Sequence, residues 1–228
     1  MKLSVIIAVL NEADGIAEAL AALAPLRARG VEVVVSDGGS SDATVAVARP
    51  LADIVVVAPR GRGRQMNAGA AASHGDALLF LHADTRLPPD ADALISDGFA
   101  RTGCAWGRFN VRVAGAHWLF PVIGAAMNLR SRVTGIATGD QAIFITRPAF
   151  GPGFPDIPLM EDIAMTTRLK RIGPPLCLAG PVVTSGRRWE KHGVIKTILL
   201  MWWLRCAYFL GANPARLARS YGYVPWQS

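Results

Sequence analysis

The first 103 residues alternate short apolar runs with more polar segments. Runs rich in β-branched residues, typical of strands, occupy residues 3–10, 31–35, 54–57 and 77–81. Because these runs are continuously apolar, both faces of each strand should be covered by helices. Between the first two runs, Ile16, Leu20, Leu23 and Leu26 recur at helical spacing and predict one amphipathic helix. The alternation predicts βαβ units around a mostly parallel sheet.

The second half of the chain carries a weaker pattern. After about residue 103 it turns to glycine-rich and aromatic stretches, then recovers a strand at residues 142–146 and a helix at residues 161–172. No linker or change of composition separates the halves. The 228 residues are therefore expected to form a single α/β domain.

Composition narrows the class of protein. Hydrophobic residues make up 51% of the chain and charged residues 18%, which supports one buried core and excludes a disordered protein. Cys104, Cys177 and Cys206 are odd in number and too far apart for a CxxC motif, so a reducing, cytoplasmic compartment is expected. The polar sequence NEADG follows the first apolar run closely, and no export signal is expected.

The net charge points to an anionic partner. The chain has 24 Lys and Arg against 17 Asp and Glu, a formal charge of +7. Nucleic acid, anionic lipid and a nucleotide diphosphate would all suit this excess. Arg60, Arg62 and Arg64 alternate with glycines after the third strand, where backbone N–H groups and guanidinium groups could bind phosphate. A solvated basic loop or a nucleic-acid contact is the alternative.

Acidic residues collect where the predicted parallel strands end. Glu12 follows the first strand, Asp37 the second and Asp84 the fourth. The carboxyl ends of parallel strands share one edge, and crowded carboxylates are costly unless a cation or hydrogen-bond donors offset their charge. This edge therefore predicts a metal or a ribose site. Asp37 also suits a turn in the sequence DGGS.

These segments together resemble family 2 glycosyltransferases of the GT-A fold. The first strand with residues 9–12 resembles that family's opening strand, residues 37–44 its DxxSxDxT segment, and residues 81–85 its DxD region. Residues 139–173 resemble the acceptor-side signature, which includes the Glu161-Asp162 pair. The resemblance implies a Rossmann-like fold with a mostly parallel sheet flanked by helices. Residues 1–103 would be its nucleotide-sugar-binding half, 104–190 its acceptor and catalytic half, and 191–228 a C-terminal helical segment.

The resemblance also implies roles for individual residues. Glu12 and Asp37 should hold the base and ribose of a nucleotide-sugar donor, and Asp84 should bind a Mn²⁺ or Mg²⁺ ion that bridges the diphosphate. Asp162, beside Glu161, should take a proton from the acceptor hydroxyl in an inverting transfer. The other expected donor contacts are Arg64, Asn67, His82, Ala83, Arg188 and Trp189.

Some positions depart from the family pattern. His82 replaces the first acid of DxD, and its imidazole could ligate the metal or lie beside the site as a core histidine. Arg64 is displaced from the usual Arg-Asn pair. Only Arg188-Trp189 match the QxxRW motif of processive relatives, which speaks against polymer synthesis.

Residues 194–210 form an aromatic segment near the C-terminus. Lys196 and Arg205 interrupt it, so its uncharged stretch is too short to span a membrane. These charges are nine residues apart and fall out of phase on a helix, so one clean apolar face is not expected. The segment should pack on the domain or lie in a membrane interface. Peripheral contact with the inner membrane face would bring a lipid-linked acceptor within reach.

Two other function classes remain open. A nucleotidyltransferase would carry a glycine-rich basic loop after the first strand, where this chain has VLNE at residues 9–12. A non-catalytic basic module could bind nucleic acid or membrane, although carboxylates at the strand ends would repel phosphates. A nucleotide-sugar that binds only with manganese would favour the transferase, and nucleic acid is then not an expected partner.

Overall fold

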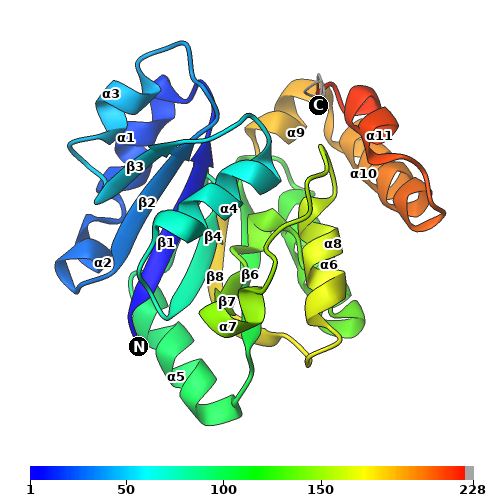
Figure 1. Ribbon diagram of the computed structural model, residues 1–228. Helices are drawn as coiled ribbons and strands as arrows, with labels where there is room; N and C mark the ends of the chain where they lie inside the picture. The colour runs from blue at the N-terminus through cyan, green and yellow to red at the C-terminus, as the bar shows by residue number, and fades with distance from the viewer. Residues whose placement is uncertain (224–228) are drawn as a thin grey trace.

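The computed structural model of the protein describes residues 1–223, which form one eight-stranded sheet (Figure 1). The strand order is β3-β2-β1-β4-β7-β6-β8-β5. The four runs predicted in the first half are all strands: β1 (Leu3–Val9), β2 (Glu32–Asp37), β3 (Ile54–Val57) and β4 (Ala77–Leu81). They pair in parallel, as predicted.

Helices connect these strands. α1 (Ala13–Ala21) and α2 (Ala24–Ala28) lie between β1 and β2, α3 (Thr44–Ala48) precedes β3, and α4 (Arg62–Ala72) precedes β4. The prediction of one helix between β1 and β2 is wrong. Pro25 has no N–H to continue the first helix and favours the first turn of a new one. Both helices still bury predicted residues, among them Ile16 and Leu26.

The second half extends the same sheet. β7 (Phe144–Thr146) pairs antiparallel with β4 and with β6 (Trp106–Ala114), while β6 pairs in parallel with β8 (Leu176–Ser185). The short β5 (Thr85–Arg86) is antiparallel to β8. The remaining elements are α5 (Ala91–Thr102), α6 (Phe120–Thr134), the 3₁₀ helix η1 (Gly139–Gln141), α7 (Arg147–Phe150) and α8 (Glu161–Leu169). The predicted strand at 142–146 and helix at 161–172 are confirmed within a few residues.

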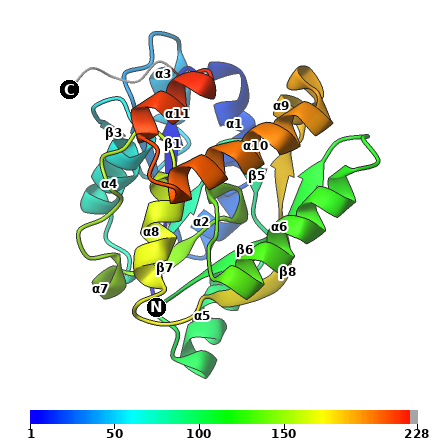
Figure 2. The same cartoon turned by 90° about the vertical axis from the view of Figure 1, so that its right-hand side faces the viewer.

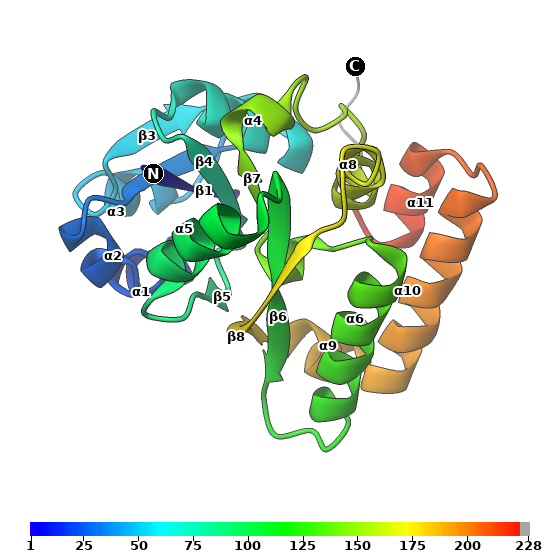
Figure 3. The ribbon, with the colours of Figure 1, turned by 90° about the horizontal axis from the view of Figure 1, so that it is seen from below.

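Helices cover both faces of the sheet, which explains the continuously apolar strands. Ile6 and Val34 pack with residues of α4 and α8. Their neighbours Val5 and Val33 point to the opposite face and pack with residues of α1, α2, α5 and α6. Figure 3 shows α4 and α8 on one side of the sheet and α5 and α6 on the other.

Three helices follow β8: α9 (Arg187–His192), α10 (Val194–Phe209) and α11 (Pro214–Ser220). α10 packs on the domain, as predicted, and buries Leu204 against residues of α8 and α11. It runs beside α6 (Figure 2). No helix within residues 1–223 is long and apolar enough to cross a membrane.

α10 is apolar on its buried and its exposed side alike, so no single apolar face is set apart, in line with the expectation from the sequence. Its exposed side carries a stripe of large apolar residues, Ile195, Leu199, Trp202, Trp203 and Phe209, and the exposed Leu210 follows directly after the helix. Lys196 and Arg205, nine residues apart, lie about half a turn from each other and therefore flank this stripe on its two sides.

Candidate active site

The carboxyl ends of β1, β2 and β4 meet at one edge of the sheet, as the sequence predicts. Val9 pairs with Asp37, and Gly38 N donates to Val9 O over 2.9 Å. A cavity of about 260 Å³ opens at this edge. This β1 cavity is lined by Ala8, Val9, Leu10, Glu12, Arg60, Gly61, Arg62, Gln65, Pro158, Glu161 and Tyr223.

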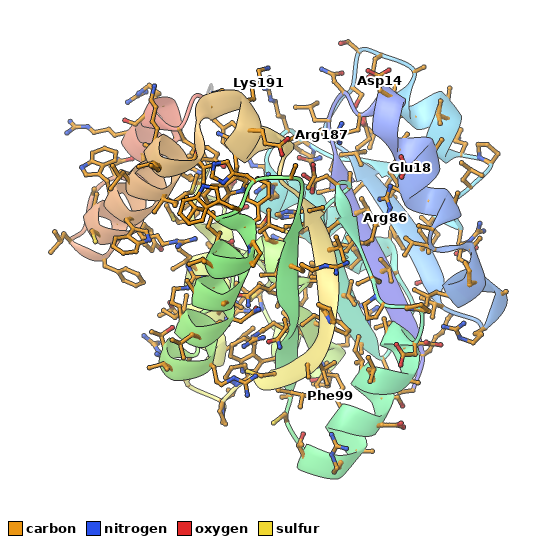
Figure 4. All side chains as sticks on the ribbon, turned by 180° about the vertical axis from the view of Figure 1, so that it is seen from behind. Asp14, Glu18, Arg86, Phe99, Arg187 and Lys191 are labelled. Atoms are coloured by element: carbon orange, nitrogen blue, oxygen red, sulfur yellow. The ribbon has the colours of Figure 1, made fainter. Side chains whose placement is uncertain are left out.

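Glu12 supplies a carboxylate to the β1 cavity. Its backbone N–H donates to Thr44 Oγ1 over 2.8 Å, which fixes the start of α1. Burial and repulsion from the Asp84 carboxylate raise the pKa of Glu12, and the charges of Arg187 and Arg62 oppose this shift. Figure 4 shows Arg187 at the same edge of the sheet. Glu12 and Asp84 therefore influence each other across the strand ends.

Asp37 is almost fully buried and holds the turn after β2. Its carboxylate accepts hydrogen bonds from the backbone of Gly39 and Ser40, both at 2.9 Å, and from the Ser40 hydroxyl. Gly39 has a φ of 85°, which glycine adopts without strain. Asp37 thus shapes the rim next to the β1 cavity.

The arginine loop places Arg62, rather than Arg64, at the site. Gly61, with a φ of 138°, turns the chain into α4. The Arg62 guanidinium then lies 3.7 Å from the Glu161 carboxylate and donates to the Tyr223 hydroxyl over 3.2 Å. Burial lowers the pKa of Arg62, but the neighbouring Tyr223 and Glu161 outweigh it and the pKa is raised. In the sequence, Gly61 directly before Arg62 could have indicated that the chain turns here and that Arg62 begins a helix at the site.

Arg64 and Asn67 hold the loop that follows α7. Arg64 makes two hydrogen bonds to the Asp156 carboxylate, of 2.6 and 2.7 Å. Asn67 donates to Phe154 O over 2.9 Å and accepts from Phe154 N over 2.8 Å. This loop leads to Pro158 and Glu161, so the two residues support one wall of the β1 cavity.

Glu161 and Asp162 begin α8 next to that wall. Asp162 Oδ2 accepts from Gly139 N over 2.9 Å, and its Oδ1 accepts from Ile163 N over 2.7 Å. Glu161 is buried, and burial raises its pKa, with Arg62 opposing and Asp162 reinforcing the shift. The backbone therefore fixes the orientation of the Asp162 carboxylate.

His82 connects this pair to a third carboxylate, Asp140. His82 Nδ1 lies 3.3 Å from Asp140 Oδ1. The other side of the imidazole packs on Gly139, where a Cβ would overlap with the ring. Burial would raise the pKa of Asp140, but the hydrogen bond and the charge of His82, with more distant arginines, bring it below its ordinary value. The sequence analysis did not single out Asp140, because its role depends on this contact between η1 and the end of β4.

A second cavity, of about 420 Å³, lies beyond Asp140 and runs between α6 and α10. Asp84, Asp140, Arg188 and Trp189 all line this α6–α10 cavity. The backbone around Asp84 is fixed by Ser185 N, which donates to Asp84 O over 3.1 Å. A small hollow that contains His82 and Asp162 shares Arg62 and Glu161 with the β1 cavity. Carboxylates thus line both cavities and the hollow that contains His82 and Asp162.

Comparison with known proteins decides the family. The sequence profile described as glycosyl transferase family 2 matches residues 4–146, more than half of the chain. The chain belongs to glycosyl transferase family 2. Nothing among curated protein sequences matches it.

Solved structures share the fold of this family 2 chain. S. aureus TarS 1-349 is similar with a TM-score of 0.66 and 19% identity over 82% of this chain and 61% of TarS 1-349. The mannosyltransferase PcManGT from Pyrobaculum calidifontis, solved with GDP-Man and Mn²⁺, has a TM-score of 0.60 and 20% identity, over 81% of this chain and 56% of PcManGT. Glucosyl-3-phosphoglycerate synthase from Mycobacterium tuberculosis was solved with Mn²⁺, UDP and glucosyl-3-phosphoglycerate. It has a TM-score of 0.57 and 19% identity, over 80% of this chain and 70% of the synthase.

These likenesses confirm the predicted GT-A fold. The chain spans about three-fifths of the length of the TarS 1-349 structures that it matches. At such low identity the structural similarity concerns the fold, and the residues of the site have to be judged from this chain itself.

The carboxylates of this family 2 chain suit a cation that is shared with a ligand. Within residues 1–223, no group of three or more His, Cys, Asp or Glu side chains gathers to hold a metal. Asp84 Oδ1 accepts only a long hydrogen bond, of 3.4 Å, from the Thr85 hydroxyl, so its oxygens are available. One or two carboxylates together with phosphate oxygens and water are a usual set of ligands for Mg²⁺. The donor set therefore fits a divalent cation bound together with a diphosphate.

The structure separates the predicted site residues into three groups. Glu12 and Glu161 line the β1 cavity, Asp84, Arg188 and Trp189 line the α6–α10 cavity, and His82 and Asp162 line the hollow between them. Asp37, Arg64 and Asn67 hold turns and loops around these cavities. Ala83 packs against the core beside Asp84, and its carbonyl lies 3.5 Å from Arg86 Nη1.

Proposed function

We propose that the protein transfers a sugar from a nucleoside diphosphate to an acceptor hydroxyl, with inversion at the anomeric carbon. Its family and fold support this proposal, and so do the titles of similar structures, which name UDP, UDP-GlcNAc and GDP-Man as their ligands. Residues 1–103 supply the donor half, 104–190 the acceptor and catalytic half, and 191–223 a helical cover. The last five residues of the expected C-terminal helical segment, 224–228, lie outside the described residues.

The donor nucleotide binds in the β1 cavity. Glu12 accepts hydrogen bonds from the base or the ribose hydroxyls, and Asp37 keeps the adjacent turn in place. Arg60 and Arg62 line the same cavity and attract the diphosphate. Arg64 and Asn67 contribute by fixing the loop that leads to Glu161.

Asp84 would hold a Mn²⁺ or Mg²⁺ ion. When bound, such an ion would supply positive charge that stabilises the nucleoside diphosphate as a leaving group. His82, oriented by Asp140 and Gly139, lies beside it, and Ala83 leaves room for the phosphates. Arg188 and Trp189 complete the far side of this site.

Asp162 takes the proton from the acceptor hydroxyl. Backbone N–H groups of Gly139 and Ile163 hold both of its oxygens, so the carboxylate is oriented before substrate binds. Positioned general bases contribute roughly 10²- to 10⁴-fold to a rate. Glu161, whose pKa is raised by burial, supports Asp162 from the adjacent position.

The exposed face of α10 makes peripheral contact with a membrane. Its stripe of apolar side chains includes Trp202 and Trp203, which favour the membrane interface, and Lys196 and Arg205 flank it. Residues 185–223 carry seven Lys and Arg against a single acidic residue, Glu190, a balance that favours an anionic surface.

The observation that carries the proposed function is the row of carboxylates at the strand ends, with Arg62 beside it. Differential scanning fluorimetry with UDP- and GDP-sugars, with and without Mn²⁺, tests it. A ligand at 100 times its Kd adds about 2.7 kcal/mol to the free energy of unfolding. Asp84→Asn should lose the manganese-dependent part of this gain, and Asp97→Asn, an exposed change on α5, should keep it. Absence of any stabilisation by nucleotide-sugars would refute the proposal.

A further inference from the structure

Three arginines line the α6–α10 cavity without an acidic partner. Arg130 lies on α6, Arg188 on α9 and Arg205 on α10. Elsewhere arginines such as Arg27 and Arg29 form close ion pairs with aspartates. Among residues 1–223, no carboxylate lies at ion-pair distance from any of the three in the cavity. Asp140 and Asp162 act on Arg130 and Arg205 only from beyond ion-pair distance, so the described chain neutralises the positive charge of this cluster only in part.

Arg130 is the most constrained of the three. Its Nε atom is buried and has no hydrogen-bond partner in the described part of the chain, and its Nη2 makes only a long contact of 3.5 Å to Thr138 Oγ1. Burial and the nearby charge of Arg205 lower the pKa of Arg130 to about 10. Burial also lowers the pKa of Arg205. Two partly buried cations that repel each other are costly, and a bound anion would reduce that cost.

Arg188 is held in a fixed orientation toward the same cavity. Its guanidinium lies 3.8 Å from the centre of the Tyr221 ring, and its Nη2 donates to Tyr221 O over 3.2 Å. A guanidinium stacked in this way loses little freedom when it binds a ligand. The anion site is thus built before any ligand arrives.

Most of the remaining surface of the cavity is apolar, apart from Asp84, Asp140 and a few hydroxyl side chains. Its walls come from two helices that lie side by side (Figure 2) and consist of Leu119, Val122, Ile123, Ala126, Met127, Ile198, Met201 and Trp202. Val122 is 58% exposed and Trp202 65% exposed, so the mouth of the cavity opens on the apolar surface of α6 and α10. A ligand that fills this space needs an apolar part as well as an anionic one.

We propose that the α6–α10 cavity binds an amphiphilic acceptor, an apolar chain whose head carries a phosphate as well as the hydroxyl that receives the sugar. The inference rests on the proposed function and names the class of acceptor. The three guanidinium groups hold the phosphate, since its three oxygens and roughly two negative charges suit several arginine forks. The chain lies between α6 and α10. Asp84, the proposed metal ligand, and Asp140, which orients His82, line the same cavity, so the head group lies beside the proposed site of transfer.

Isothermal titration calorimetry with octyl phosphate, below its micelle concentration, tests this binding. Octyl phosphate should bind at least tenfold more tightly than octanol or inorganic phosphate. Arg130→Gln should weaken its binding at least tenfold, whereas Arg132→Gln, on the exposed side of the same helix, should leave it unchanged. Trp202→Ala should weaken it, and Trp203→Ala, one residue along on α10, also exposed but outside the cavity lining, should not.

Each contrary result overturns the inference. If octanol bound as tightly as octyl phosphate, the arginines would not contribute to binding. If inorganic phosphate bound as tightly, the apolar walls would not contribute. Displacement of octyl phosphate by UDP would assign the arginines to the donor. Nucleotide-sugar binding by Arg130→Gln, measured in the same samples, reports on folding and on the donor site. If the unmodified protein bound no nucleotide-sugar, the proposed transferase function would be refuted. The binding of octyl phosphate would still show whether the cavity takes an amphiphilic phosphate.

Discussion

His82 Nδ1 and Asp140 Oδ1 lie 3.3 Å apart, and this pair joins the end of β4 to η1. The imidazole stands where the family pattern has an acid, and the acid is supplied from the other half of the chain. The pair also joins the hollow that contains Asp162 to the cavity that contains Asp84. The two halves of the proposed reaction therefore meet at one side-chain contact.

Removal of this imidazole should change the pH dependence of transfer. Burial raises the pKa of Asp140, and His82 is the leading group that lowers it below 3.8. In His82→Ala the Asp140 carboxyl should keep its proton to higher pH, because the leading contact that lowers its pKa is gone. The acidic limb of kcat/KM should move to higher pH as well. A pH–rate profile of the two proteins with one nucleotide-sugar measures this shift, and coincident acidic limbs would argue against a role for ionised Asp140.

Asp162→Asn should separate transfer from donor binding. The amide keeps the shape of the side chain and one oxygen for a backbone N–H, but it does not take up a proton. We expect kcat to fall by roughly 10²- to 10⁴-fold. Stabilisation by the nucleotide-sugar should persist, and Asp97→Asn should have normal kcat. An unchanged kcat in Asp162→Asn would assign the base to another residue.

Gly139→Ala should disturb the site through a steric contact. A Cβ at this position would overlap with the His82 ring, so the imidazole or η1 has to shift. Overpacking of this kind costs about 1 to 3 kcal/mol. Gly15→Ala is the matched control, because nothing lies within 4 Å of the added Cβ and alanine favours the interior of α1. Its free energy of unfolding should rise by about 0.5 to 1 kcal/mol. Urea unfolding of both variants measures the contrast.

Glu32 should make stability depend on pH far from the site. Its carboxylate accepts from Ser4 Oγ over 2.6 Å and from His74 N over 2.7 Å, with Lys2 Nζ at 3.8 Å. Burial raises its pKa, but these contacts outweigh it and the pKa lies below 4.5. A lowered carboxyl pKa adds stability above about pH 4.5 that is lost as the pH falls through the folded value.

Glu32→Gln should therefore lose less stability between pH 6 and pH 3.5 than the unmodified protein does. Urea unfolding at several pH values within this window checks the slope. Glu190→Gln, an exposed change on α9, is the control and should follow the unmodified protein. Identical slopes for all three proteins would show that Glu32 does not contribute.

The first half of the fold was predictable because its strands are apolar on both faces. β6 was not, because Arg108 and Asn110 interrupt its pattern. In the structure Arg108 is fully buried and donates to the Asn110 side chain and, over 3.1 Å, to Asn128 O on α6. Asn128 belongs to another element of the fold, so the pattern of residues 106–114 alone does not show why a polar Arg108 can be buried in a strand.

The candidate site, like the fold, was predictable from the sequence only in part. Glu12 and Asp84 follow directly from parallel strands, whose ends have to share an edge. Arg62 and Asp140 do not, since one depends on how Gly61 turns the chain into α4 and the other on the packing of Gly139 against His82. Contacts between distant segments decide both positions.

The last described turn of the chain ties the two cavities together. Tyr223 lines the β1 cavity and bonds to Arg62, and Tyr221, two residues earlier, lines the α6–α10 cavity and stacks on Arg188. An insertion or deletion between α10 and α11 would shift both walls at once. A graft that exchanges acceptor preference between related enzymes therefore has to carry the helices after β8 as one block, or donor recognition will change with it.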